Sequence, residues 1–178
     1  MKKINYKTQV LSKATLTESF KEEIHKLKQT HYKYSLISQK NWFDKYINAQ
    51  DKHILLFKDG KVIGYNVLRI RKLIIVYKQK KIEQNCYLFD TLVIYPNLRN
   101  QGLSKLIMNK SNQLIKNRNY FSVLVCSNNL VNYYKKFNWN LLPKNKIVFS
   151  ENLMRNNKRV MVNGKKLNLK KIIRIKVI

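Results

Sequence analysis

A short turn between an apolar segment and an amphipathic segment constrains the fold of this chain more than any other feature. The apolar residues 92–95 run into Pro96, and the turn then reads Arg-Asn-Gln-Gly-Leu-Ser at residues 99–104. This order predicts a strand, a glycine turn and then a helix. Such a turn leaves backbone N–H groups unpaired at the helix start, where the helix dipole adds partial positive charge. The turn is therefore shaped to bind a phosphate.

Length and composition favour one domain over residues 1–178. The 178 residues are 44% hydrophobic, which is enough for a packed core. No apolar run reaches the length of a membrane span, and the basic residues 1–7 lack the apolar block of a signal peptide. Cys86 and Cys126 have neither metal nor redox spacing. We therefore predict a cytoplasmic protein with two free thiols and no metal site.

The charge balance is the unusual part of the composition. Thirty-seven Lys and Arg residues stand against nine Asp and Glu residues, which gives a net charge of +28. An AT-rich genome would explain many lysines and asparagines, but it would not explain the scarcity of acids. A field this positive favours anionic partners such as phosphates, nucleic acid or acidic lipid surfaces, and it repels polyamines.

Helices and a hairpin are expected in the first half. Thr17 is placed to cap a helix with Phe20, Ile24 and Leu27 on one face, and a second helix fits residues 36–49. An Asp-Gly turn at residues 59–60 predicts a hairpin of residues 53–57 and 62–68. Residues 73–77 prolong its second strand or form another.

A βαβ unit is expected in the second half. A strand at residues 87–94 precedes the turn and its helix, and a buried strand follows at 121–126. Ser127 is placed to cap one more helix, with Leu130, Tyr133, Tyr134 and Phe137 on its apolar face. We expect residues 151–178 to form a C-terminal β extension. A strand at 147–149 precedes it, and within it we expect a hairpin of 160–162 and 167–169 and an edge strand at 172–178.

The order of these elements and two motifs resemble the GNAT acyltransferase superfamily over roughly residues 15–150. The first motif is the turn 99–104, and the second is Tyr-Lys-Lys-Phe-Asn-Trp at residues 134–139. Ser104 replaces the usual third small residue of the turn. Asn138 replaces a glycine, and asparagine tolerates the left-handed backbone that this position requires. The last helix, which is expected to start at Cys126 and Ser127 and to end with a tryptophan, resembles that of the branch containing aminoglycoside 2′-N-acetyltransferases. The implied fold is α/β, a mixed twisted sheet with helices on both faces.

The resemblance implies acetyl-CoA, or a longer acyl-CoA, as the acyl donor. Backbone N–H groups of residues 101–104 would bind its pyrophosphate, and Arg99 and Lys105 would add charge. The pantetheine arm would lie between the splayed strands of Ile94 and Val125, and a nearby N–H would polarise the thioester carbonyl. The residues expected to bind CoA are Leu92, Val93, Ile94, Arg99, Asn100, Gln101, Gly102, Leu103, Ser104, Lys105 and Asn129. An ordinary strand–helix turn is the alternative interpretation.

The chemistry needs two proton transfers. Tyr134 matches the family tyrosine that often acts as general acid, and its phenol, with a reference pKa of about 10, is protonated at neutral pH. Packing in the core is the alternative role, and Tyr133 is the substitute. Asp90 matches an acidic position that takes the amine proton in some relatives; a buried partner of a Lys or Arg is the alternative. His31 and His53 are the other candidate bases.

Three functions follow from these observations. The first is transfer of an acetyl group to a primary amine of an unidentified acceptor by direct attack in a ternary complex. The second keeps the fold and directs the transfer to tRNA or another nucleic acid, as some toxins of the superfamily do. The third is a basic nucleic-acid-binding protein without catalysis. Either a monomer or a homodimer is compatible with each. The aromatic residues expected near the acceptor are Tyr32, Tyr34, Trp42 and Phe43, the last two also fitting plain helix core.

Overall fold

The computed structural model describes residues 5–77, 80–149, 158–164 and 174–178. The chain forms two compact units, residues 1–69 with 90–111 and residues 70–89 with 112–178. Three elements contribute residues to both units: β3 (Lys61–Tyr77), β4 (Lys80–Ile94) and α3 (Ser104–Arg118).

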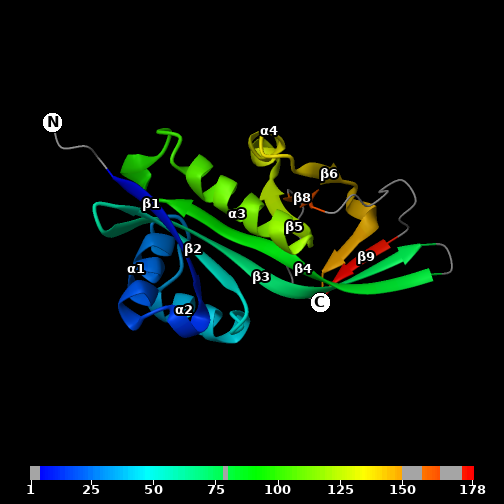
Figure 1. Ribbon diagram of the computed structural model, residues 1–178, viewed down its shortest axis with the longest axis horizontal. Coiled ribbons are helices and arrows are strands. Elements are labelled where there is room, and N and C mark those ends of the chain that lie inside the picture. Colours follow the sequence, from blue (N-terminus) through cyan, green and yellow to red (C-terminus); the bar gives the residue numbers. More distant parts are fainter. Residues whose placement is uncertain (1–4, 78–79, 150–157, 165–173) are drawn as a thin grey trace. The chain divides into compact units, whose positions relative to one another are not determined.

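The first unit is a sheet in the order β1-β2-β3-β4. β1 (Tyr6–Ser12) pairs antiparallel with β2 (Lys52–Lys58), and β2 pairs antiparallel with β3. The helices α1 (Glu18–Gln29) and α2 (Leu36–Tyr46) lie together in this unit (Figure 1). Short 3₁₀ turns occupy Lys13–Thr15 and Pro96–Leu98.

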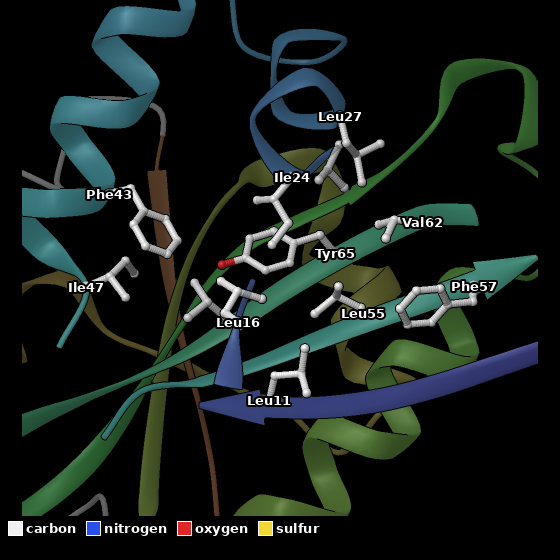
Figure 2. Packing of buried hydrophobic residues seen from close by; sticks show 12 residues of the cluster. Leu11, Leu16, Ile24, Leu27, Phe43, Ile47, Leu55, Phe57, Val62 and Tyr65 are labelled. Carbon is white, nitrogen blue, oxygen red and sulfur yellow. The ribbon is translucent and has the colours of Figure 1, made fainter. Parts of the chain in front are cut away.

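Alternation along the strands gives this unit a core on each face of its sheet. Tyr65 points toward α1, and Figure 2 shows its ring between Ile24 and Leu16. Gly64 faces the opposite way, toward Ile107 of α3. Because neighbouring residues of a strand point to opposite faces, helices cover both faces of this sheet.

Both early helices start at the residues that the sequence predicts. The Thr17 side chain accepts a hydrogen bond from the N–H of Phe20, and Ser35 accepts one from Ser38. These caps satisfy N–H groups that the helix itself leaves unpaired. α2 ends at Tyr46, three residues before the predicted end, because Ile47 is extended.

The second unit is a sheet in the order β4-β5-β8-β6, with β9 paired to both β3 and β7. β4 pairs in parallel with β5 over Cys86–Phe89, and β7 pairs in parallel with β9; β5–β8, β6–β8 and β3–β9 are antiparallel. The strands are β5 (Phe121–Ser127), β6 (Asn140–Leu142), β7 (Ile147–Phe149), β8 (Lys158–Asn163) and β9 (Arg174–Val177). The unit also holds α4 (Val131–Lys135) and the 3₁₀ turns Asn128–Leu130 and Lys144–Lys146.

This mixed α/β fold, a mostly antiparallel sheet flanked by helices, confirms the predicted fold class. The hairpin of β2 and β3, the helix after the glycine turn and the parallel strand β5 are also confirmed. β3 continues to Tyr77, so residues 73–77 prolong the hairpin strand.

Two predictions are wrong, and one strand was not predicted. Residues 6–12, for which no strand was predicted, form β1, an edge strand whose polar outward face hides its pattern. Ser127 does not cap α4: its hydroxyl donates to Asn129, the helix begins with a 3₁₀ turn, and Leu130 is exposed. The strand near the C-terminus is no edge strand, because β9 has a partner on each side. Residues 167–169 and 172–173 lie outside the described residues.

None of the helices in the described ranges is long and apolar enough to cross a membrane.

Gly64 tests how tightly α3 packs on the sheet of the first unit. A Cβ at this position would lie 2.5 Å from Ile94 Cδ1 and 3.0 Å from Ile107 Cδ1. We expect Gly64→Ala to lower the free energy of unfolding by about 1–3 kcal/mol through overpacking. Ile94→Val removes the nearest atom, so the same substitution should cost less in that background. Chemical denaturation of the two single variants and the double variant measures this, and simple additivity of the two losses would contradict it.

Candidate functional site

The turn before α3 holds two residues in the left-handed region of backbone space. Asn100 has φ +61° and Gly102 has φ +73°, a conformation that asparagine and glycine tolerate best. A Cβ on Gly102 would meet no atom within 4 Å, so open space lies directly above the backbone. The glycine is therefore needed for its backbone conformation, and a ligand could approach this backbone closely.

Backbone N–H groups are available along the same turn. The α3 helix closes its first hydrogen bonds from Lys105 N to Gly102 O at 3.0 Å and from Leu106 N to Leu103 O at 3.1 Å. Within the described part of the chain, the N–H groups of residues 101–104 have no backbone acceptor outside the helix. The turn opens a 15-residue helix, and unpaired N–H donors at a helix start are groups to which anions bind in proteins.

Arg99 and Lys105 flank these donors, and both are exposed. Arg99 Nε donates to the carbonyl of Ile94 at 3.0 Å, so its guanidinium is tied to the end of β4. Gln101 Nε2 donates to the carbonyl of Asn97 at 3.3 Å and holds the turn from the other side. Leu103 is buried, which anchors the turn to the core.

The strand that leads to the turn has an irregular backbone at Thr91. This residue is buried and has φ +58°, which is unusual for a β-branched side chain inside a strand. Such a conformation re-aims the groups that follow it. Val93 and Ile94 are buried, Leu92 is half-buried, and the pairing of β4 with β5 ends at Phe89, before these residues.

Asp90 is the acidic residue of this strand, and it forms an ion pair. Its Oδ2 lies 3.0 Å from Nη1 of Arg69, whose side chain is fully buried, while the Asp90 side chain is 27% exposed. Arg69 Nε also donates to the carbonyl of Tyr46 at 3.3 Å. Thr91 Oγ1 donates to the other carboxylate oxygen at 3.3 Å. The buried-partner role expected as an alternative for Asp90 is thus present, with Arg69 as the partner.

Two buried polar side chains fix the backbone of Asp90 through hydrogen bonds. Asn66 Nδ2 donates to the Asp90 carbonyl at 2.7 Å, and Ser111 Oγ of α3 lies 3.1 Å from Asn66 Oδ1. Asn66 and Ser111 are both fully buried. The position of Asp90 is therefore fixed by β3 and by α3 together.

Aromatic rings and a second cation lie beside this pair. The guanidinium of Arg69 lies 5.4 Å from the ring centroid of Trp42 and 5.5 Å from that of Tyr46. Lys28 Nζ lies 3.8 Å from the same Trp42 ring, and Lys28 is 3% exposed. Cations placed over aromatic faces in this way are attracted by the ring quadrupole.

Burial controls the protonation of the groups around Asp90. Burial raises the pKa of Tyr32 well above its ordinary value, and the charge of Asp90 adds to this effect. Burial lowers the pKa of His53 to about 4, so its imidazole is neutral at pH 7. His53 Nδ1 lies 2.8 Å from the hydroxyl oxygen of Tyr65. His31 is exposed and packs edge-on against Tyr32.

The other aromatic residues expected near the acceptor take different positions. Phe43 is buried and packs in the core between α1, α2 and the sheet, as its alternative interpretation predicted. Trp42 is half-buried and faces the two cations. Tyr34 is 57% exposed.

Tyr134 and Asn129 belong to the second unit. Tyr134 is buried, with its ring edge-on to Phe89 at 5.9 Å, and Asn129 is exposed. The turn after α4 forms as predicted: Asn138 has φ +64°, and the N–H of Trp139 donates to the Tyr134 carbonyl at 3.3 Å. Trp139 is buried, so this turn anchors α4 in the unit.

Sequence reasoning missed Arg69, Lys28 and Asn66, which the structure places around Asp90. Arg69 ends the run of apolar residues at 62–68, and an arginine there reads as an ordinary strand end. Lys28 is one of many lysines. The one available signal was Asp90 itself, since an acid within an apolar strand needs a buried partner.

Within the described ranges, no group of three or more His, Cys, Asp and Glu side chains could hold a metal ion.

Comparisons with known proteins identify the family and the fold. The model of the acetyltransferase (GNAT) family matches residues 14–139. A search of curated proteins finds no match. Among solved structures, the GNAT family N-acetyltransferase YhbS from Escherichia coli in complex with CoA has a TM-score of 0.65 at 15% identity and covers 98% of this chain and 89% of its own.

Two further structures share the fold. An acyl-CoA N-acyltransferase from Pseudomonas aeruginosa has a TM-score of 0.65 at 13% identity, with 90% of this chain and 100% of its own covered. The ribosomal-protein-S18-alanine N-acetyltransferase from Escherichia coli has a TM-score of 0.61 at 11% identity, covering 90% and 96%. Because the family model spans well over half of the residues, this chain belongs to the acetyltransferase (GNAT) family.

Proposed function

We propose that this protein transfers an acyl group, most simply acetyl, from acyl-CoA to a primary amine. The observation that carries the proposal is the turn before α3, with open space over Gly102 and unpaired N–H groups at a helix start. A diphosphate is the group that such donors recognise, and CoA carries one. The family and the CoA-bound relative support the same donor.

In this proposal the turn binds the CoA diphosphate, and the strand before it orients the pantetheine arm. The N–H groups of residues 101–104 bind the diphosphate. Asn100 lines the same turn, and Arg99 and Lys105 add positive charge there. Main-chain groups of Leu92, Val93 and Ile94 pair with the pantetheine amides, and one of their N–H groups polarises the thioester carbonyl. We also assign Asn129 a polar contact to CoA. The end of the β4–β5 pairing at Phe89 supports this role for the strand, because residues beyond it need another partner.

Bound acyl-CoA supplies a thioester carbonyl, at which a C–N bond forms and the C–S bond breaks. Asp90 accepts the proton that the attacking amine loses, directly or through a water molecule. Its ion pair with Arg69 fixes Oδ2, while Oδ1 is held only by the longer contact with Thr91. Tyr134 donates a proton to the leaving thiolate. Attack is direct, in a ternary complex, so no acyl-enzyme is needed.

Several finer assignments belong to the same proposal. The motif at Cys126 and Ser127, with Trp139 at its end, suggests kinship with the branch of aminoglycoside 2′-N-acetyltransferases, of which we carry over the architecture and not the substrate. We place the protein in the cytoplasm, as a monomer or homodimer with no metal in its mechanism.

A second function, acetylation of an amine carried on tRNA, is favoured by the net charge of +28. Nucleic acid is the partner that a strongly cationic surface attracts most, because binding releases condensed counterions. Retention of the nucleic acid interaction without catalysis is the remaining alternative.

CoA binding should depend on Gly102 and not on a matched glycine elsewhere. Gly60 also has a positive φ, +83°, and nothing within 4 Å of its added Cβ, but it lies in the turn between β2 and β3. We expect CoA to raise the Tm of wild type and of Gly60→Val, and Gly102→Val to lose at least about 10-fold in affinity because the valine fills the cradle. Isothermal titration with CoA checks this. Equal affinities in all three proteins would contradict the proposed cradle.

Tyr134→Phe should lower the turnover of acetyl-CoA with an accepted amine by about 10²-fold while CoA affinity is unchanged, because only the proton donor is lost. The measurement follows release of the CoA thiol with a panel of primary amines. Tyr133→Phe, one residue away, is the comparison and should retain the wild-type rate. If only Tyr133→Phe loses activity, the acid assignment moves to Tyr133; if neither variant does, both tyrosines are packing residues.

If the protein acts on tRNA, its affinity for tRNA should fall steeply with the logarithm of salt concentration, since the contacts are to phosphates. Filter binding or fluorescence anisotropy at several salt concentrations measures this slope. An affinity that does not change with salt would contradict a role of the net charge in binding nucleic acid.

A further inference from the structure

Lys28 of α1 is a buried cation without a counter-charge of its own. The residue is 3% exposed, and its ammonium lies 3.8 Å from the Trp42 ring centroid. Among the described residues, Lys28 has neither a hydrogen-bond acceptor nor a carboxylate within ion-pair distance. An ammonium group has three N–H donors, and a cation–π contact satisfies none of them as a hydrogen bond would.

Leaving such a group unpaired is costly, so its presence needs a reason. Burial lowers the pKa of Lys28 to about 8, with the charge of Asp90 opposing this effect and that of Arg69 adding to it. With that pKa, most of the ammonium remains charged at pH 7. A methionine of similar length would fill the same space without the electrostatic cost, so packing alone does not explain a lysine here.

The surroundings of Lys28 carry one excess positive charge. Arg69 and Asp90 neutralise each other in their ion pair at 3.0 Å, and Lys28 stands over the same Trp42 ring as Arg69. Tyr32, beside Asp90, has a phenol that burial keeps neutral. A single negative charge would therefore balance the group, whereas a dianion would exceed it.

The ammonium of Lys28 is not completely covered by the described part of the chain. Lys28 Nζ is not among the side-chain nitrogens and oxygens of the described ranges that are fully covered and have no hydrogen bond. Since it has no partner either, the small exposed part of Lys28 includes its ammonium.

We propose that Lys28 binds the carboxylate of the acceptor, so that the preferred substrates are small amines that also carry a carboxylate, that is, amino acids. The inference rests on the proposed function, because it places the second substrate at the side of Asp90. The substrate carboxylate supplies the monoanion that the Lys28, Arg69 and Asp90 group lacks. Its amine lies toward Asp90, which takes the proton.

The test compares matched pairs of amines. We would measure acetyl transfer to ω-amino acids from glycine to 6-aminohexanoate and to n-alkylamines of the same chain length. Wild type should favour the amino acid at one or more lengths by at least about 10-fold in kcat/KM. Lys28→Met should remove this preference and keep the fold, because a neutral side chain of similar length replaces an unpaired charge. Lys26→Met, an exposed lysine on the same helix, is the control and should keep it.

A second arm needs no acyl transfer. Saturation-transfer NMR without acyl donor should detect binding of the preferred amino acid to wild type and to Lys26→Met, but not to Lys28→Met. If no amine is acetylated yet this binding pattern is seen, the carboxylate site stands and the proposed function fails. If transfer occurs equally to amino acids and alkylamines, the proposed function stands and the carboxylate site is overturned. An aminoalkylphosphonate that outcompetes the amino acid overturns the choice of a monoanion.

Discussion

The ion pair between Arg69 and Asp90 is the interaction on which the proposed acceptor site, around Asp90 and Lys28, depends. A fully buried guanidinium is tolerable only when its charge is neutralised and its N–H donors are hydrogen-bonded. Here Asp90 neutralises the charge in an ion pair of 3.0 Å, and the carbonyl of Tyr46 at the end of α2 accepts a hydrogen bond from Arg69 Nε. One cation thereby ties two strands and a helix end together within the first unit. Removing either partner would leave an unpaired buried or half-buried charge, so the carboxylate that we propose as proton acceptor is also part of the structure.

The proposed acyl-CoA site, the turn at residues 99–104, depends on backbone conformation more than on side-chain chemistry. Two left-handed residues, Asn100 and Gly102, turn the chain, and consecutive N–H groups stay unpaired before α3 closes its own hydrogen bonds. Arg99, which we expect to add charge for a phosphate, also donates to the carbonyl of Ile94. Its cationic group is thus held where the strand ends and the turn begins. Such preorganisation lets the turn receive an anion without paying to order a flexible loop.

The sequence predicted what local chemistry dictates and missed what tertiary pairing decides. The Thr17 cap, the Asp-Gly hairpin and the left-handed Asn138 each follow from a residue's own conformational preference, and the structure contains all three as predicted. β1 was missed because a short edge strand with one polar face lacks a distinctive pattern. Arg69 and Lys28 were missed because burial of a cation is settled by distant partners, here Asp90 and Trp42. The candidate site was therefore predictable at the glycine turn and only half predictable at Asp90.

The net charge links the two sides. Nine acids stand against 37 cations, and two of these acids, Asp51 and Asp90, are placed inside or at the edge of the first unit's core. The external field thus remains strongly positive, and a field of this sign draws anions such as phosphates toward the protein. The same field repels a simple alkylamine, because that amine is itself a cation at neutral pH. An amino acid is a neutral zwitterion and approaches without this penalty. Long-range charge and the unpaired ammonium of Lys28 therefore favour the same class of acceptor for independent reasons, one acting before binding and the other within the site.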